Sequence, residues 1–178
     1  YVSHNLSSVS NLCKTGILLE NGQISSTGAI DKVIDKYIGA RKNNAIKKEH
    51  GVIRELNISQ VGNKIQIYCK YSSKNELAIP CFGFVISDHY ENKIFGTNPQ
   101  YNVPDKPLKP SKKGEILVTI NTPQLINGLY MLSVWMGDGK VNYEELENII
   151  QFEVINMVKF DKDNIASGPV FCKADFDF

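Results

Sequence analysis

The feature that most constrains the fold is a change in the spacing of apolar residues near residues 40–50. After Gly51 the spacing becomes two, and in the clearest run Ile65, Ile67, Cys69 and Tyr71 alternate with Gln66, Tyr68 and Lys70. Successive side chains of a β-strand point to opposite faces of a sheet, so this alternation predicts strands with one buried face. The chain from residue 51 onward is therefore predicted to be mainly β.

Seven short segments carry this strand pattern: 52–58, 65–71, 81–86, 93–97, 116–120, 128–136 and 148–155. Frequent turn signals separate them, which favours an antiparallel β-sandwich, either immunoglobulin-like or jelly-roll. Four prolines in 98–113 cannot donate to a sheet ladder and predict a long surface loop. Residues 168–171 form a candidate eighth strand, which pairs either within its own subunit or with a partner's sheet.

The first 40 residues have a different pattern, predicted to be a short helix, a hairpin and a second helix. The hairpin turns at Glu20-Asn21-Gly22, and the second helix carries one apolar stripe within 29–38 that ends at Gly39. The polar stretch 25–28 is expected to open that helix. Three parts follow: 1–40, an exposed linker at 41–50 within a polar, mostly basic stretch, and the sandwich at 51–178.

Composition limits the partners. The chain has 178 residues, 42% of them hydrophobic, which is enough for one main core and a short appendage. A net charge of +1 provides no broad positive field, so nucleic acid is not expected as a partner. No apolar run approaches the roughly 20 residues that cross a bilayer, and the N-terminus lacks a signal-peptide pattern. The expected location is the cytoplasm.

The cysteines and histidines predict no metal site. The four cysteines, Cys13, Cys69, Cys81 and Cys172, are far apart and are interpreted as free thiols in a reducing compartment. The three histidines, His4, His50 and His89, lack metal-ligand spacing.

The order of motifs in the first 40 residues resembles the end of an ABC-transporter ATPase domain. The string VSHNLSSVSNLCKTGILLENGQISSTGAIDKVIDKYI contains a histidine after a strand, a helix ending in cysteine, an E-N-G hairpin and a further helix. In that family the residue matching His4 contacts the terminal phosphate of ATP. No phosphate loop, acidic magnesium-binding strand end or ABC signature is present here, so no catalytic residue is assigned and this fragment is not expected to hydrolyse ATP. ATP and Mg²⁺ would belong to the parent ATPase, whose body the second helix is expected to contact.

The segments behind this tail resemble the C-terminal domain of the Wzt-type subunit that exports O-antigen polysaccharide. The matching pieces are PCFGFVISD at 80–88, IFGTN at 94–98, NGLYMLSV at 127–134 and FEV at 152–154. The resemblance implies a β-sandwich that forms a homodimer and binds the lipopolysaccharide O-antigen being exported. It also implies contact with the transmembrane permease through the parent ATPase, and a location at the cytoplasmic face of the inner membrane.

Trp135 is the first candidate for contact with a sugar. If Tyr130, Leu132, Val134 and Met136 face the core, alternation turns Met131, Ser133 and Trp135 outward. In an immunoglobulin-like strand order the neighbouring strands would add Gly83, Gln151 and Glu153 to the same face. Aromatic faces cover pyranose rings while amides and carboxylates meet the hydroxyls. Alternatively, a dimer mate or a loop covers Trp135, and the sandwich is a purely structural dimerisation module.

Three other features rank lower. Gln66, Tyr68 and Lys70 form a second outward row, more typical of a solvated face. Glu144, Glu145 and Glu147 are expected in a turn, where they do not make a glycosidase pair. Four lysines, Lys106, Lys109, Lys112 and Lys113, lie in or beside the proline-rich loop, where they either meet an anionic saccharide or are ordinary surface residues.

Overall fold

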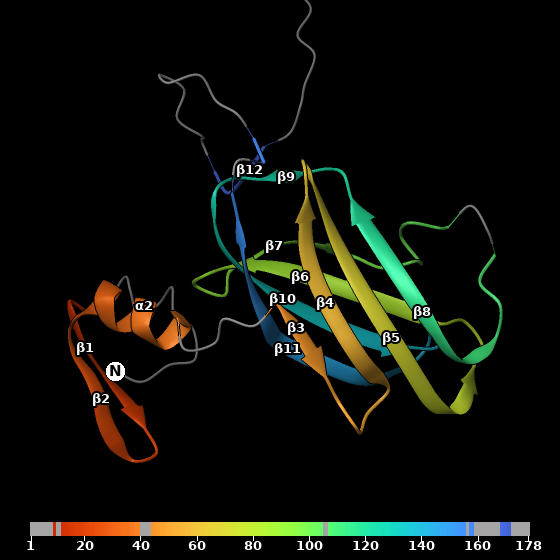
Figure 1. The fold of residues 1–178 in the computed structure, drawn as a ribbon, viewed down its shortest axis with the longest axis horizontal. Coiled ribbons are helices and arrows are strands. Elements are labelled where there is room, and N and C mark those ends of the chain that lie inside the picture. Colours follow the sequence, from red (N-terminus) through yellow and green to blue (C-terminus); the bar gives the residue numbers. More distant parts are fainter. Residues whose placement is uncertain are drawn as a thin grey trace, which may run out of the picture.

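The computed structural model describes residues 9, 12–39, 44–104, 107–155, 157–158 and 168–171. A small N-terminal unit lies beside a larger two-sheet sandwich (Figure 1). The N-terminal unit contains the hairpin β1 (Thr15–Glu20) and β2 (Gln23–Ala29), followed by helix α2 (Ile30–Gly39). Asn21 and Gly22 make the predicted turn with φ of 51° and 78°, values typical of a type I′ turn. Residues 25–28 belong to β2 rather than opening the helix.

Two four-stranded antiparallel sheets form the sandwich (Figure 1). The first has the order β11–β10–β6–β7, with β6 (Cys81–Asp88), β7 (Lys93–Thr97), β10 (Gly128–Gly137) and β11 (Asn142–Val154). The second has the order β3–β4–β5–β8, with β3 (Ala45–Lys47), β4 (Ile53–Val61), β5 (Lys64–Leu77) and β8 (Ser111–Ile120). The predicted β-sandwich is confirmed.

The core lies between these sheets and uses the faces that alternation predicts. The alternating residues of β5 and β10 are all buried in one cluster: Ile65, Ile67, Cys69, Tyr71, Tyr130, Leu132, Val134 and Met136. Burial raises the pKa of the Cys69 thiol to about 12. Cys13, Cys69 and Cys81 are free, whereas Cys172 lies outside the described residues.

Two segments differ from the expected boundaries. The predicted linker contains β3, which adds an edge strand to β4 although Ile46 is its one large apolar residue. β11 begins at Asn142, so the glutamates expected in a turn lie on a strand. Polar residues dominate the start of β11, because that part of the strand lies near an exposed edge, and strand periodicity is hard to see there.

The last described strand, β12 (Val170–Phe171), pairs with β9 (Gln124–Leu125) of the same chain. The hydroxyl of Tyr130 lies within hydrogen-bond distance of the carbonyl oxygens of Ile126 (2.7 Å) and Pro169 (3.2 Å). These contacts join the start of β10 to the segment that leads into β12. The proline-rich loop forms no strand in its described part before β8 begins at Ser111.

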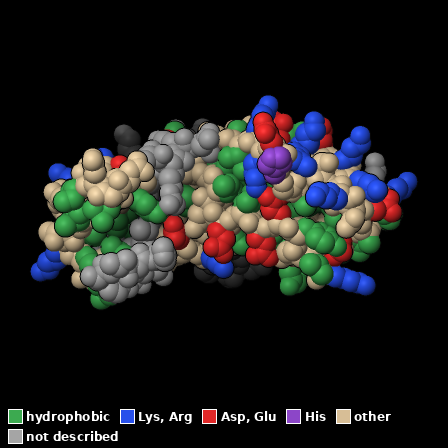
Figure 2. Space-filling view, turned by 90° about the horizontal axis from the view of Figure 1, so that it is seen from below, with side chains coloured by type: hydrophobic (Ala, Val, Ile, Leu, Met, Phe, Trp, Pro, Cys, Tyr) green, Lys and Arg blue, Asp and Glu red, His purple; other side chains and the backbone are tan. Residues whose placement is uncertain are grey.

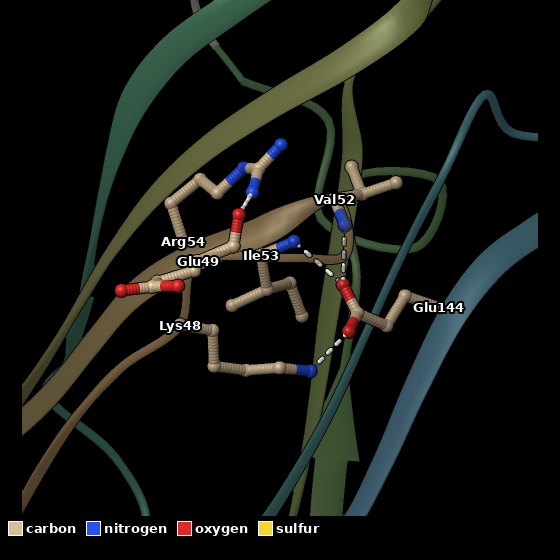
Figure 3. A network of polar contacts seen from close by, with 6 residues as sticks. All are labelled: Lys48, Glu49, Val52, Ile53, Arg54 and Glu144. Carbon is tan, nitrogen blue, oxygen red and sulfur yellow. Dashed lines mark hydrogen bonds and ion pairs between the residues drawn. The ribbon is translucent and has the colours of Figure 1, made fainter.

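A partly buried carboxylate connects the two sheets at the β3–β4 turn (Figure 3). Glu144 of β11 accepts hydrogen bonds from the backbone N–H groups of Val52 and Ile53, both at 2.6 Å, and from the ammonium of Lys48. Although burial works to raise it, the pKa of Glu144 is lowered by the hydrogen bonds from Lys48, Ile53 and Val52 and by the Lys48 charge. We call these four residues the Glu144 clamp.

The N-terminal unit contacts the sandwich through Tyr90, which lies in the β6–β7 turn. Tyr90 packs against a small apolar cluster centred on Ile30 and Ile34 of α2. The other face of the hairpin exposes Ile17, Leu19 and Ile24 by 63–65%, and hydrophobic surface is visible at that end of the molecule (Figure 2). No helix in the described part of the chain is long and apolar enough to span a membrane.

Candidate functional site

Trp135 lies on the outer face of the first sheet, as alternation predicts. Its strand neighbours Val134 and Met136 are buried in the core, whereas the Trp135 side chain is partly exposed. Gly83 of β6 is its direct partner across the ladder. A Cβ atom added to Gly83 would overlap the indole atoms Cζ2 and Cε2. The missing side chain at residue 83 therefore allows the indole to lie against the sheet.

A groove of about 480 Å³ runs along this face of the first sheet, and Trp135 lines it. The groove is formed by side chains from all four strands of the sheet and from the β6–β7 turn. Its polar lining includes Ser87, Ser133, Asn142, Asn148, Glu145 and Glu147. Glu91 and Lys93 also line it from the β6–β7 turn and β7. We call it the Trp135 groove.

A β-bulge in β11 brings Asn148 to Ser133. Leu132 pairs with Ile150 but Val134 pairs with Leu146, so β11 contains two extra residues between these pairs. Asn148 within this bulge has φ of 46°, and its backbone N–H donates to Ser133 Oγ at 2.9 Å. Ser133 Oγ in turn donates to Asn148 Oδ1 at 3.3 Å. The bulge thus fixes an amide and a hydroxyl beside each other in the groove.

Glu145 is the cross-strand partner of Trp135 on β11. Its Oε1 accepts a hydrogen bond of 2.7 Å from the side-chain amide of Asn142. Directly paired residues of adjacent strands have their Cβ atoms roughly 4.5–5.5 Å apart. A carboxylate is therefore held beside the indole, on the opposite side from Gly83.

Three of the six residues predicted for the site, Gly83, Ser133 and Trp135, come together at the groove. Met131 and Gln151 do pair with each other, but they are only 3% and 1% exposed and do not line the groove. Glu153 is exposed and pairs with Leu129, six residues from Trp135 along β10. These three residues therefore lie outside the groove.

Sequence reasoning missed Glu145 and Asn148 because it did not anticipate the bulge in β11. Without the two extra residues, continuing the Met131–Gln151 register would place residue 147 opposite Trp135. A bulge leaves no strong pattern in a run as polar as 142–148. Asn148 itself is a weak signal, because asparagine tolerates positive φ better than most residues.

The second outward row, Gln66, Tyr68 and Lys70, lies on the outer face of the other sheet. Gln66 and Tyr68 line a small hollow of about 210 Å³, and Lys70 forms an exposed ion pair with Glu115 at 3.8 Å. Burial by neighbouring groups and then the hydrogen bond to Glu115 raise the pKa of Tyr68. The row has the features of a solvated face.

Other predicted features lie away from the Trp135 groove or outside the described residues. His4 and Lys106 lie outside the described residues. Lys112 and Lys113 lie on β8 of the second sheet. Lys109 lines a mostly apolar hollow of about 440 Å³ between the β7 and β8 edges, with Phe82, Phe84 and Leu108. In the described part of the chain, no group of three or more His, Cys, Asp or Glu residues could hold a metal ion.

Comparison with known proteins agrees with this architecture. The family model of the Wzt C-terminal domain matches residues 48–171. A solved structure, the crystal structure of the C-terminal domain of wzt, superposes with a TM-score of 0.54 at 14% sequence identity. The match covers 75% of this chain and 86% of that one, and at this identity it shows the fold. No curated protein matches the chain.

Proposed function

This chain belongs to the Wzt C-terminal domain family, the C-terminal domain of an ABC transporter subunit, and we propose that it binds a surface polysaccharide of the O-antigen type for export across the inner membrane. The domain itself is not enzymatic. The observation that carries the proposal is the Trp135 groove, in which a partly exposed indole lies over Gly83 beside hydroxyl, amide and carboxylate groups.

The groove chemistry suits a pyranose ring. A sugar has an apolar C–H face that packs on an aromatic ring, and hydroxyls that need polar partners when they leave water. Trp135 supplies the aromatic surface, while Ser133, Asn148 and Glu145 supply donors and acceptors. Because several of these groups are already positioned by hydrogen bonds, binding would cost less ordering of side chains.

The proposed mechanism is recognition without chemistry. A glycan held in the groove would stay close to the transporter, so its local concentration there would rise. Residues 1–40 would form the C-terminal end of the ATPase domain of the parent subunit. That ATPase domain would bind ATP and Mg²⁺ and contact the transmembrane permease. The exposed hydrophobic face at Ile17, Leu19 and Ile24 supports a partner at that unit. The domain would work as a homodimer on the cytoplasmic face of the inner membrane.

The test uses the fluorescence of Trp135, since the chain has one tryptophan. The protein is titrated with the surface polysaccharide of its own host and with an unrelated polysaccharide. We expect a saturable change with the host polysaccharide alone. Trp135→Ala should abolish binding measured by calorimetry, whereas Tyr68→Ala on the opposite face should bind normally.

Two results would reject glycan binding at this groove. If calorimetry detects no binding to the host polysaccharide, the sandwich is better explained as a structural dimerisation module. If the polysaccharide binds with equal affinity to Trp135→Ala and to the unmodified chain, the site lies elsewhere. In the first case, analytical ultracentrifugation of Trp135→Ala would show whether the indole belongs to a dimer interface.

A further inference from the structure

The ionisable groups of the Trp135 groove are mostly acidic. Among the described residues that line it, Glu91, Glu145 and Glu147 contribute carboxylates and Lys93 contributes the one ammonium. Glu145 and Glu147 both come from β11, at one edge of the sheet. Glu91 comes from the β6–β7 turn, which lies toward the opposite edge of the same sheet. A ligand lying along Trp135 therefore meets carboxylates from two sides.

We propose that this groove selects glycan segments that are neutral or carry an amino group, and that Glu145 and Glu147 reject segments bearing a carboxylate or phosphate. The inference rests on the proposed function, because it names the class of sugar that the same groove accepts. Electrostatic complementarity contributes more to discrimination between ligands than to raw affinity.

Of Glu145 and Glu147, Glu145 is placed to have the larger effect on the charge of the ligand that binds. It pairs directly with Trp135, and Asn142 holds one of its oxygens by a hydrogen bond of 2.7 Å. A carboxylate can accept about four hydrogen bonds in total, so this contact leaves capacity for sugar hydroxyls or an ammonium group. A sugar packed on the indole would therefore lie next to a fixed negative charge.

Glu147 lies in the bulge that also carries Asn148, and its side chain is exposed. It adds a second negative charge along the same strand, beyond Ser133. Two like charges on one wall of a groove raise the cost of bringing in an anion, even where water screens them. The single Lys93 on β7 does not balance both of them together with Glu91.

Four other charged side chains that the sequence singles out do not line this groove. The sequence offered three lysines as contacts for an anionic sugar. Lys109 lines the hollow between the β7 and β8 edges of the two sheets, and Lys112 and Lys113 lie on β8 of the second sheet. Glu144, although next to Glu145 in sequence, is bound by Lys48 and two backbone N–H groups in the Glu144 clamp. The acidic character is therefore a property of the groove itself.

The experiment compares three forms of one oligosaccharide, cut from the host surface polysaccharide. The first form is native, the second has its primary hydroxyls oxidised to carboxylates, and the third has them replaced by amines. Each is titrated into the protein by calorimetry, in a buffer where the amines are protonated. We expect the oxidised form to bind about tenfold more weakly than the amine form, a ratio typical of one or two nearby charges.

The variant Glu145→Gln/Glu147→Gln keeps the shape of both side chains and removes their charge. It should reduce the ratio between the amine and oxidised forms to nearly one, while Trp135 fluorescence still reports binding. Glu115→Gln is the matched control, because it removes a carboxylate from the outer face of the second sheet. It should leave the ratio unchanged.

The outcomes separate this inference from the proposed function. If the fragments bind at Trp135 but the oxidised form binds as well as the amine form, the charge selection is wrong and glycan binding stands. The charge selection is also wrong, and glycan binding again stands, if the native segment that binds at Trp135 carries a uronate or phosphate. If no form binds, the proposed function fails and this inference fails with it.

Discussion

At the scale of single residues, the pair Gly83 and Trp135 determines the shape of the candidate site. The two residues come from neighbouring strands and occupy one register position, and the indole fills the space where a side chain at residue 83 would lie. A large aromatic side chain can lie along a sheet only where its neighbour is small. The site therefore depends on the absence of a single methyl group.

The variant Gly83→Ala tests this dependence. The added methyl group would overlap the indole, which must then turn away from the sheet, and we expect glycan affinity to fall by about tenfold. Gly128→Ala is the matched control, because a Cβ at that β10 position would make only ordinary contact with the Tyr130 ring, at 3.6 Å. Calorimetry would compare the glycan affinity of the two variants with that of the unmodified chain. Unchanged affinity in Gly83→Ala would show that the indole position is unimportant.

Gln151 gives a second prediction at this scale. Its side chain is 1% exposed, and neither its amide nitrogen nor its oxygen has a hydrogen-bond partner among the described residues. Burying an unpaired polar group costs free energy, so Gln151→Leu should raise the free energy of unfolding by about 1 kcal/mol. Glycan affinity should not change, since Gln151 lies outside the groove. Chemical denaturation measures the first effect, and destabilisation would mean that the amide is paired in solution.

The sequence identifies some of these residues and not others for a physical reason. Alternation depends only on local geometry, so it correctly turned Trp135 and Ser133 outward. The place of Gly83 beside the indole came instead from the immunoglobulin-like strand order. Whether an outward position is exposed depends on what covers it, and Met131 and Gln151 are buried. Their burial cannot be recognised from the spacing of apolar residues in their own strands.

At the scale of elements, the Glu144 clamp joins strands that are far apart in sequence. Glu144 belongs to β11 of the first sheet, whereas Ile53 begins β4 of the second sheet and Val52 directly precedes it. The clamp connects the two sheets beside the short strand β3. Neither β3 nor this contact was predicted, because a Glu in a polar run gives no indication of its partner.

The clamp predicts a pH-dependent stability. The pKa of Glu144 is lowered in the folded chain. Its carboxylate therefore contributes fully to the free energy of unfolding above the ordinary pKa of 4.5, and this contribution is lost as pH falls through the pKa of the folded chain. Glu144→Gln should lower the free energy of unfolding by about 1–3 kcal/mol at neutral pH, and the difference should shrink in acid. Urea denaturation across this pH range measures it.

Glu115→Gln serves as the comparison for the Glu144 variant. Glu115 forms an exposed ion pair with Lys70, and such pairs contribute about 0–1 kcal/mol. A loss as large in Glu115→Gln as in Glu144→Gln would show that net charge, rather than the clamp, determines the effect. A difference that persists in acid would show that the carboxylate charge of Glu144 is not responsible.

At the scale of the whole molecule, the order of elements followed from the sequence more reliably than their contacts. The hairpin, α2 and most strands appear where the spacing of apolar residues predicts them, because secondary structure depends on near neighbours. The contact between the N-terminal unit and the sandwich depends instead on Tyr90, which lies in a polar turn. Asp88 Oδ1 accepts hydrogen bonds from the backbone N–H groups of Tyr90 and Asn92, which hold this turn.

Tyr90→Ala should therefore loosen the N-terminal unit without unfolding the sandwich. Removing the ring takes away apolar contact with Ile30 and Ile34, so the amides of α2 should exchange with deuterium faster. The sandwich amides of β5 and β10 should keep their protection, because their core lies between the two sheets. Tyr101→Ala, which removes a ring that is 82% exposed, is the control. Equal exchange of α2 in both variants would mean that Tyr90 does not hold the two units together.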